Sequence, residues 1–211
     1  MNLEPYLAQS ERWPRSGRQI LAWFDEKSIV VYQAFKPAIG RFAAEHGHFG
    51  GDFGVGRMSW IKPNFLWMMF RSGWGTKKDQ EVTLAVRLER SAFDAILAQA
   101  VPSSFGAARG LYRSEEEWKA AVASSSVRAQ WDPDHHPSGA PLERRAIQLG
   151  LRGETLRRYA GEWLLGIEDI SSFVREQRAH VEARAYERLV TPVERPYPVS
   201  DPGTRARLAL D

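Results

Sequence analysis

The sequence predicts a mixed α+β fold in a single compact domain, with a central mixed sheet of five or six strands flanked by helices. A chain of 211 residues fits one hydrophobic core, because single cores stop growing near about 250 residues. Its hydrophobic content of 43% and charged content of 26% are close to those of globular domains. Stretches that alternate polar and apolar residues are separated by stretches with helical spacing, which indicates strands interleaved with helices.

Composition divides the chain into three parts. Residues 1–16 are polar and contain Pro5 and Pro14, so we expect an N-terminal arm on the surface before regular structure begins. Residues 17–199 carry the periodic patterns and form the expected single catalytic or binding domain. Residues 200–211 are expected to be a C-terminal tail, and the proline-rich end of the chain is predicted to be extended.

A strand followed by a helix is predicted to open the domain. Residues 18–24 (RQILAWF) alternate with period two, as in a half-buried strand. Asp25 is then expected to cap a helix from Glu26 to about His46, in which apolar residues recur at helical spacing. Pro37 lies inside this range and predicts a kink or a break.

The later elements follow from the same patterns. The predicted strands are 58–61, 81–89, 127–131 and 145–151, and the predicted helices start near Pro63 and cover 91–100, 114–123, 154–164 and 171–188. Ser114 followed by Glu117 is a capping box, which marks a helix start. Residues 132–137 (DPDHHP) are predicted to be a turn.

Residues 47–56 (GHFGGDFGVG) contain five glycines, which predicts a flexible loop. Their spacing matches neither the phosphate loop of nucleoside triphosphatases nor the dinucleotide-binding motif. A plain hairpin is the simpler interpretation. We also treat the loop as a candidate lid over a ligand.

Composition excludes several chemistries. The chain has no cysteine, which excludes disulfides, thiolate nucleophiles and iron–sulfur clusters. No apolar run reaches the ~18 residues that a membrane span requires, so we expect a cytoplasmic protein. The net charge of +3 is compatible with a nucleic-acid partner without requiring one. Twenty-three of the 29 basic residues are arginines, which suits phosphate binding but also follows from a GC-rich genome.

The predicted turn at 132–137 gathers ionisable side chains. We predict no metal site there, because adjacent histidines rarely face one ion and the chain has no HExxH pattern. Histidine titrates near neutral pH, so the turn suits proton transfer as well as it suits a solvated surface turn. A serine triad is not predicted, because a GxSxG motif is absent from the sequence.

Residues 57–78 interleave aromatic and basic side chains, which is the composition of a surface that stacks bases and holds phosphates. We interpret this stretch as the basic wall of a cleft, formed by Arg57, Lys62, Arg71, Trp74 and Lys77. The alternative is a helix whose buried face is Phe65, Leu66, Met69 and Phe70. Upstream, Asp25 and Glu26 could hold a cationic substrate, although helix capping by Asp25 is the simpler role.

Four stretches carry a resemblance to a known family: RQILAWFDEKSIVVYQAF at 18–35, RMSWIKPNFLWMMFRSGW at 57–74, QWDPDH at 130–135 and RAIQLGLRG at 145–153. Over residues 15–199 the chain resembles the domain-of-unknown-function family 4291. We associate this family with the arginine-containing cyclodipeptide synthases described in fungi. The resemblance implies a reaction between two aminoacyl-tRNAs, one of them arginyl-tRNA, that forms a diketopiperazine without metal, cofactor or ATP.

The resemblance and the residue patterns together assign candidate roles. Asp132 or His135 would deprotonate the attacking amine, and Asp25 or Glu26 would bind the arginyl guanidinium. The expected catalytic residues are Asp132, His135, Tyr32 and Glu26. The expected substrate-binding residues are Arg18, Asp25, Gln33, Trp60, Trp67, Trp131 and Gln148. The expected RNA- or phosphate-binding residues are Arg57, Lys62, Arg71, Trp74, Lys77 and Arg152.

Two alternative functions remain open from the sequence. Arg18 in a strand, the aromatic-rich middle and the later Glu81 are loosely similar to the spaced Arg, Ser and Glu of NAD-dependent ADP-ribosyltransferases. A noncatalytic RNA-binding module would need only the basic and aromatic stretch, and its RNA binding would be strongly salt-dependent.

Overall fold

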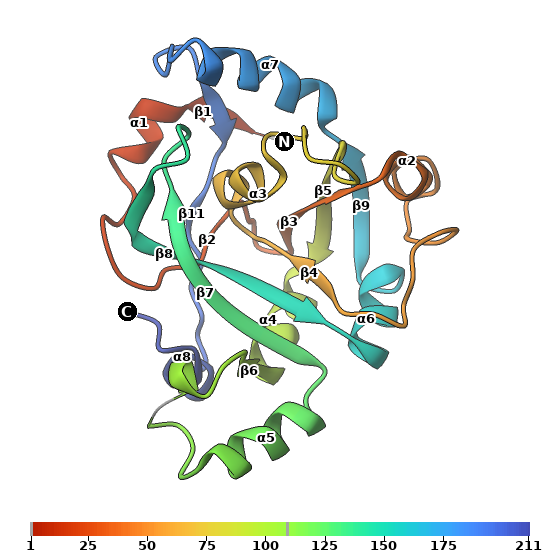
Figure 1. Cartoon of the computed structure of the whole chain (residues 1–211), viewed down its shortest axis with the longest axis vertical. Helices are drawn as coiled ribbons and strands as arrows, with labels where there is room; N and C mark the ends of the chain where they lie inside the picture. The colour runs from red at the N-terminus through yellow and green to blue at the C-terminus, as the bar shows by residue number, and fades with distance from the viewer. Residues whose placement is uncertain (1, 109) are drawn as a thin grey trace.

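The computed structural model describes residues 2–108 and 110–211 and confirms the predicted α+β fold (Figure 1). The first main sheet has the order β3-β5-β9 and contains Ser28–Phe35, Val82–Glu89 and Leu164–Asp169. The second has the order β4-β8-β7-β6 and contains Ser59–Ile61, Pro141–Leu151, Val127–His135 and Ala100–Pro102. Neighbouring strands are antiparallel except β6 and β7, which are parallel.

The two main sheets are joined at one point. The backbone of Tyr32 in β3 exchanges two hydrogen bonds with Lys62, directly after β4, at N···O distances of 2.7 and 3.2 Å. The sheet layer is therefore nearly continuous, although the structure has sheets of three and four strands where the sequence predicts one sheet of five or six.

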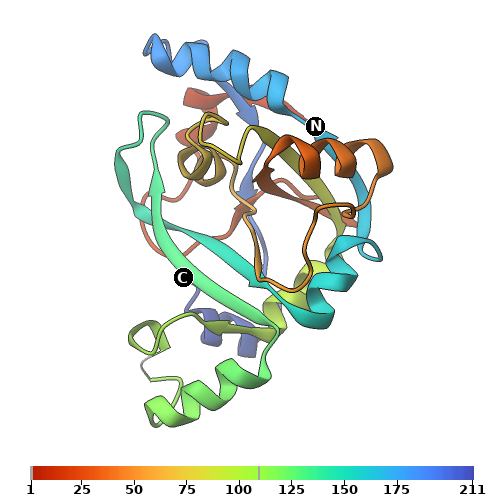
Figure 2. The ribbon, with the colours of Figure 1, turned by 45° about the vertical axis from the view of Figure 1, so that its right-hand side comes forward.

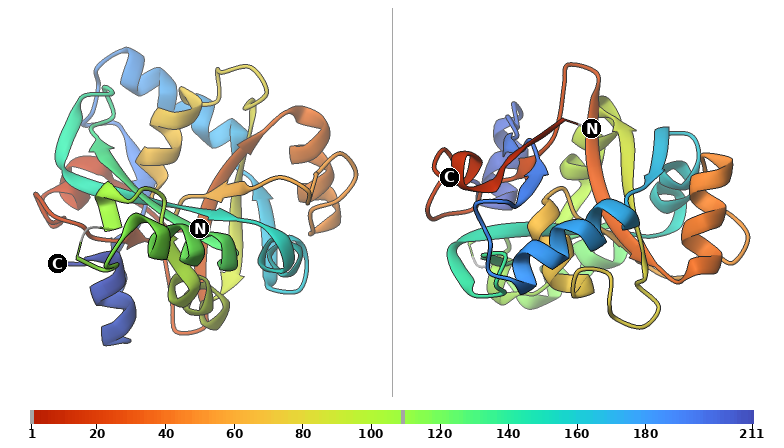
Figure 3. Two further views of the ribbon diagram at one scale, coloured as in Figure 1. Left: turned by 60° about the horizontal axis from the view of Figure 1, so that its bottom comes forward. Right: turned by 90° about the horizontal axis from the view of Figure 1, so that it is seen from above.

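Helices cover the sheets from several sides. They are α2 (Pro37–His46), α3 (Phe65–Ser72), α4 (Arg90–Gln99), α5 (Glu115–Ser124), α6 (Gly153–Ala160) and α7 (Ser171–Glu182), with a 3₁₀ turn at Gly106–Ala108. Figure 2 shows α5 at one end of the molecule and α7 at the other. From above, α7 runs between α2 on one side and the β7–β8 hairpin on the other (Figure 3). In the described part of the chain, no helix has the length and apolar character needed to cross a bilayer.

Strand β3 is buried on both faces. Ile29 and Val31 belong to one hydrophobic cluster, whereas Val30 and Tyr32 belong to a second cluster on the opposite face. This division follows from the period of two in a β-strand. A strand buried on both sides lacks the polar alternation that identifies a half-exposed strand.

The predicted helix from Glu26 is therefore wrong over its first half. Residues 28–35 form β3, and only Pro37 onward is helical, with the proline in the first turn, where its missing N–H is no loss. Asp25 caps a turn instead of a helix: its Oδ1 accepts hydrogen bonds from the backbone N–H groups of Lys27 and Ser28 at 2.9 and 2.7 Å. The predicted strand at 18–24 is reduced to the short β2, Leu21–Ala22.

The predicted turn at 132–137 is also wrong, because β7 continues through His135 with an irregularity after Pro133. The chain reverses one residue later, where His136 N–H donates to the carbonyl of Ala140 at 2.9 Å.

Two predicted helices are shorter than expected. The helix predicted at 154–164 ends at Ala160, and β9, which was not predicted, follows it. The helix predicted to reach Arg188 likewise ends at Glu182.

Both ends of the chain contain regular structure that the sequence did not predict. Strand β1 (Leu3–Pro5) pairs with β10 (Val190–Pro192), and β2 pairs with β11 (Arg195–Pro196). Helix α1 (Tyr6–Ser10) follows β1, and helix α8 (Pro202–Leu208) lies near the C-terminus. Tyr6 and Trp13 are 5% exposed. Most of the first 16 residues are on the surface, as expected, but Tyr6 and Trp13 anchor the segment in the second hydrophobic cluster.

The helix start at Ser114 is confirmed, although the glutamate half of the capping box reaches the preceding residue. The Oγ of Ser114 accepts a hydrogen bond from Glu117 N–H at 3.2 Å, and Glu117 Oε2 accepts one from Arg113 N–H at 2.7 Å. The strand predicted at 81–89 and the helix predicted at 91–100 are present as β5 and α4. These elements have strong local signals, so tertiary context does not override them.

Candidate functional site

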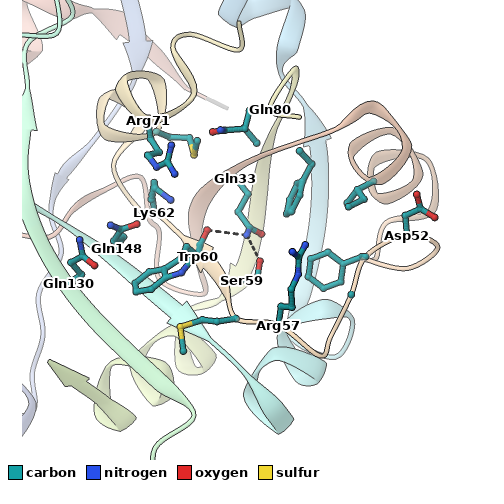
Figure 4. Close-up of a pocket in the computed structure, with 17 residues that line it drawn as sticks. Gln33, Asp52, Arg57, Ser59, Trp60, Lys62, Arg71, Gln80, Gln130 and Gln148 are labelled. Carbon is teal, nitrogen blue, oxygen red and sulfur yellow. Dashed lines mark hydrogen bonds between the residues drawn. The ribbon is translucent and has the colours of Figure 1, made fainter. Parts of the chain in front are cut away.

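A cavity of about 660 Å³ opens where the end of β3 meets β4, α3 and the glycine-rich loop. Its lining is mostly polar and contains glutamines, cationic side chains and aromatic rings (Figure 4). The residues that carry this chemistry are Gln33, Gln80, Gln130, Gln148, Arg57, Lys62, Arg71, Trp60, Phe35 and Phe53. The volume is within the range of about 300–1,000 Å³ typical of small-molecule sites.

Lys62 lies at the inner side of this cavity. The residue is 4% exposed, and among the described residues its Nζ has no hydrogen-bond or ion-pair partner. Burial, together with the positive charge of Arg71, lowers the pKa of Lys62 from 10.5 to about 8, whereas Asp132 acts in the opposite direction. The backbone pairing with Tyr32 and the helix start at Asn64 fix its position.

Gln33 in β3 forms hydrogen bonds to β4 and to Tyr159 at the wall of the cavity. Its Nε2 donates to Ser59 Oγ at 2.9 Å and to the carbonyl of Trp60 at 3.0 Å, and its Oε1 accepts from the hydroxyl of Tyr159 at 2.6 Å. Both ends of the amide are therefore engaged within the protein. We conclude that Gln33 positions β4 and Trp60 against β3.

Two glutamines hold a carboxylate behind the cavity. Gln130 and Gln148 are directly opposite each other in β7 and β8. Their Nε2 atoms donate to the two oxygens of Asp132, at 2.9 and 2.8 Å. Because a carboxylate only accepts hydrogen bonds, this contact fixes each amide orientation. The two amide oxygens are thus turned away from Asp132, on side chains that line the cavity.

The mouth of the cavity is basic and is covered on one side by the glycine-rich loop. Arg57 and Arg71 are exposed. Asp52 at the tip of the loop forms a 2.6 Å ion pair with Lys36. The loop thus lies beside the cavity, where the candidate lid is expected.

His135 lies outside the cavity lining, in contact with two aromatic rings of α3. Its ring stacks on Trp67 and Phe70, at centroid distances of 5.4 and 3.4 Å. In the described structure its Nδ1 is buried without a hydrogen-bond partner, and burial lowers the pKa of His135. The surroundings of His135 and Trp67 are those of packed core side chains.

The carboxylates expected to bind a guanidinium lie at the opposite end of β3 from the cavity. Asp25 already pairs with Arg87 at 2.7 Å, and hydrogen bonds from Lys27 and Ser28 contribute to lowering its pKa to about 2. Glu26 is exposed in the same turn.

Tyr32, an expected catalytic residue, is fully buried on the face of β3 away from Gln33. Tyr32 and Gln33 both lie on this strand and not on the expected helix.

The other predicted binding residues have structural contacts of their own. Arg18 pairs through its backbone with Arg145 and Asp211, and Trp131 Nε1 donates to the carbonyl of Leu208 at 3.0 Å. Trp74 packs against Phe65, and Lys77 Nζ donates to the carbonyl of Arg71 at 2.7 Å. Arg152 donates to carbonyls at the end of α5. Of the predicted site residues, the structure gathers Gln33, Arg57, Trp60, Lys62, Arg71 and Gln148 around the cavity.

Sequence reasoning missed two features. Gln130 was not proposed as a site residue, although its place two residues before Asp132 on a strand puts both on one face. A buried ion pair was also missed: Arg144 Nη2 lies 2.5 Å from Asp134 Oδ2, and these side chains are 6% and 1% exposed. No grouping of three or more His, Asp or Glu side chains suited to a metal ion occurs within residues 2–108 and 110–211.

The fold and the site define a small α+β protein with a basic, amide-rich cavity of about 660 Å³. The chain belongs to the family described as Domain of unknown function (DUF4291), whose model matches residues 19–197. The resemblance noted from the four sequence stretches is thus confirmed at the level of the family. A search of curated proteins found no match.

Proposed function

We propose that the protein is a tRNA-dependent peptide-bond-forming enzyme of the arginine-containing cyclodipeptide synthase type. The observation that carries the proposal is the cavity around Lys62, whose mouth is cationic and whose lining includes Trp60. Aromatic stacking and cationic phosphate contacts are how proteins hold a single-stranded RNA end. Because tRNA is charged and used in the cytoplasm, the proposal includes a cytoplasmic location.

The dimensions of the cavity support this ligand. About 660 Å³ accommodates one nucleoside with an attached aminoacyl group. Trp60 is half-buried, so part of its ring remains available for stacking on a base. Arg57 and Arg71 line different sides of the cavity (Figure 4) and are exposed, so both are available to contact the preceding phosphates.

The proposed reaction needs positioning more than a strong base. The α-amine of one aminoacyl group attacks the ester carbonyl of the other, a C–N bond forms, and the ester C–O bond breaks. The ribose oxygen takes up the proton that the amine loses, and the first tRNA leaves. The free α-amine of the resulting dipeptidyl-tRNA then attacks the remaining ester carbonyl in the same way, which closes the ring and releases the second tRNA. An α-amine has an ordinary pKa of about 8, so much of it is neutral at physiological pH, and holding the reactants together supplies a large share of the rate.

The arginyl side chain requires a different site from the one expected. Asp25 is engaged by Arg87 and lies far from the cavity along β3. Within the cavity, the amide oxygens of Gln130 and Gln148, with the charge of Asp132 behind them, are suitable acceptors for a guanidinium. We assign arginine recognition to this trio.

Untargeted mass spectrometry of a bacterial host that expresses the protein tests the proposal. The expected result is a new arginine-containing cyclic dipeptide that disappears with Lys62→Met and with Asp132→Asn. Lys78→Met is the matched control, because Lys78 is exposed and does not line the cavity. Product from Lys62→Met at the wild-type level would contradict the assignment of the cavity, and absence of any new product would contradict the synthase.

The noncatalytic RNA-binding alternative uses the same cavity, and RNA binding without a product would favour it. For the ADP-ribosyltransferase alternative, Glu81 lines a surface pocket with Pro37 and Arg175, and Arg18 is not part of that lining. No structural observation favours that second reaction.

A further inference from the structure

Lys62 is a buried cation for which the protein supplies no direct partner among residues 2–108 and 110–211. Buried charges in proteins are ordinarily paired or hydrogen-bonded, because desolvation is costly. Arg144, which is buried to a similar degree, follows this rule through its ion pair with Asp134. The ammonium of Lys62 instead faces a cavity large enough for a ligand.

The groups around Lys62 favour an anion at this point. Arg71 on α3 directs its guanidinium toward the same part of the cavity (Figure 4) and acts on Lys62 as a like charge. Asp132 on β7 has the opposite charge, but both its oxygens accept hydrogen bonds from amides. From β3 the cavity receives the neutral side chain of Gln33.

The remaining charged groups of the cavity do not alter the excess of positive charge around Lys62. Arg57 adds a positive charge at the mouth, on the segment that follows the glycine-rich loop. Asp52 is on the same side, but it is exposed and paired with Lys36 at 2.6 Å. A bound anion would therefore meet two or three cations and no free carboxylate in the described lining.

We propose that Lys62 and Arg71 form a subsite for a phosphate oxyanion, and that binding there is coupled to uptake of a proton by Lys62. The subsite stands on the geometry of the cavity, and only the identity of the phosphate, as part of a tRNA 3′ end, rests on the proposed function. Free nucleotides carry the same chemistry, so the experiment compares both sources.

The proton coupling follows from the thermodynamic linkage between anion binding and protonation of Lys62. Without a ligand, Lys62 is partly neutral near pH 8. An adjacent anion stabilises the ammonium form and raises the pKa of Lys62, so binding draws a proton from solution. Affinity should be nearly constant below pH 7 and fall by about ten-fold between pH 7 and pH 9.

Isothermal titration calorimetry of the full chain with sulfate tests the subsite, because sulfate stays a dianion over this pH range. At pH 8 in two buffers with different ionisation enthalpies, we expect proton uptake on binding. Lys62→Met should weaken binding at least ten-fold, Lys62→Arg should retain binding without the pH dependence, and Lys78→Met should behave like wild type. Equal binding by wild type and Lys62→Met, or no binding of sulfate at 10-millimolar concentrations, would overturn the proposal.

A measurement on the unmodified protein covers the case in which a variant does not fold. Acylation of Lys62 by acetic anhydride, followed by mass spectrometry, reports the fraction of neutral amine. Sulfate should slow this reaction at pH 8 and leave the exposed Lys78 unaffected. An unchanged rate at Lys62 would overturn the subsite.

Two ligands distinguish the source of the phosphate. An RNA minihelix ending in ACCA and free AMP are titrated under the same conditions. Binding of the minihelix that depends on Lys62 supports a phosphate of the tRNA end. Binding of AMP and sulfate but not of the minihelix would retain the subsite and contradict the tRNA function. Minihelix binding that is the same in wild type and Lys62→Met would contradict the assignment of the tRNA phosphate to this subsite.

Discussion

Replacing Lys62 by methionine is expected to stabilise the folded protein, because it removes the charge of a side chain that is 4% exposed and has no ion-pair partner among the described residues. Burial and the charge of Arg71 lower the pKa of Lys62 from 10.5 to about 8. At about 1.4 kcal/mol for each pKa unit, the charged form is roughly 3 kcal/mol less favourable in the folded chain than in the unfolded chain. Methionine keeps a similar side-chain length, so it leaves little new cavity. We expect a gain of about 2–3 kcal/mol in the free energy of unfolding at pH 7.

This gain should depend on pH in a defined direction. Below pH 8, Lys62 is charged in both the folded and the unfolded chain, so wild type carries the full penalty. Between pH 8 and pH 10.5 the folded chain loses this proton first, and the penalty shrinks. Above 10.5 the group is neutral in both states, and the advantage of the methionine variant should vanish.

Urea unfolding followed by circular dichroism at pH 7 and at pH 10 measures both effects. Lys78→Met is the control, because Lys78 is exposed and its replacement should change little at either pH. A Lys62→Met protein that is less stable than wild type at pH 7 would refute the reasoning. A gain of the same size at both pH values would show that it does not come from the buried charge.

Three further predictions concern packing and charge near the site. Asp134→Ala should cost about 3–5 kcal/mol in urea unfolding, because it leaves its arginine partner buried and unpaired; a loss below 1 kcal/mol would contradict this. In thermal melts, Gly40→Ala should destabilise by about 1–3 kcal/mol, because the new Cβ would overlap a side chain of β5, whereas Gly54→Ala meets nothing within 4 Å and should be near neutral. Asp132→Asn should lower the pKa of Lys62, because Asp132 is the group that raises it; the midpoint of Lys62 acylation against pH measures this, and an unchanged midpoint would argue against the coupling.

Elements with strong local signals were predictable from the sequence. The helix after Ser114 and the strand β5 carry a capping box and a clear apolar run, and both are present. Strand β3 was assigned to a helix because its residues are buried on both faces, so their apolar positions fit helical spacing as well. Strand β9 has only six residues, and its pairing with β5 comes from tertiary structure.

The candidate site was predictable only in its composition. The stretch 57–78 supplied Trp60, Lys62 and Arg71, because the density of cations and aromatics is visible in the sequence. The glutamine pair that holds Asp132 depends on the register of the β7–β8 hairpin, which places Gln130 opposite Gln148. Periodicity does not specify that register.

The most direct test of the central claim is reconstitution with purified components. The protein is incubated with arginyl-tRNA and a second aminoacyl-tRNA, and the mixture is analysed by liquid chromatography and mass spectrometry, with wild type, Lys62→Met and Lys78→Met compared. The account predicts an arginine-containing cyclic dipeptide and deacylated tRNA with wild type and Lys78→Met, and neither above background with Lys62→Met. Wild-type protein that leaves both tRNAs charged, or a Lys62→Met protein as active as wild type, would contradict it.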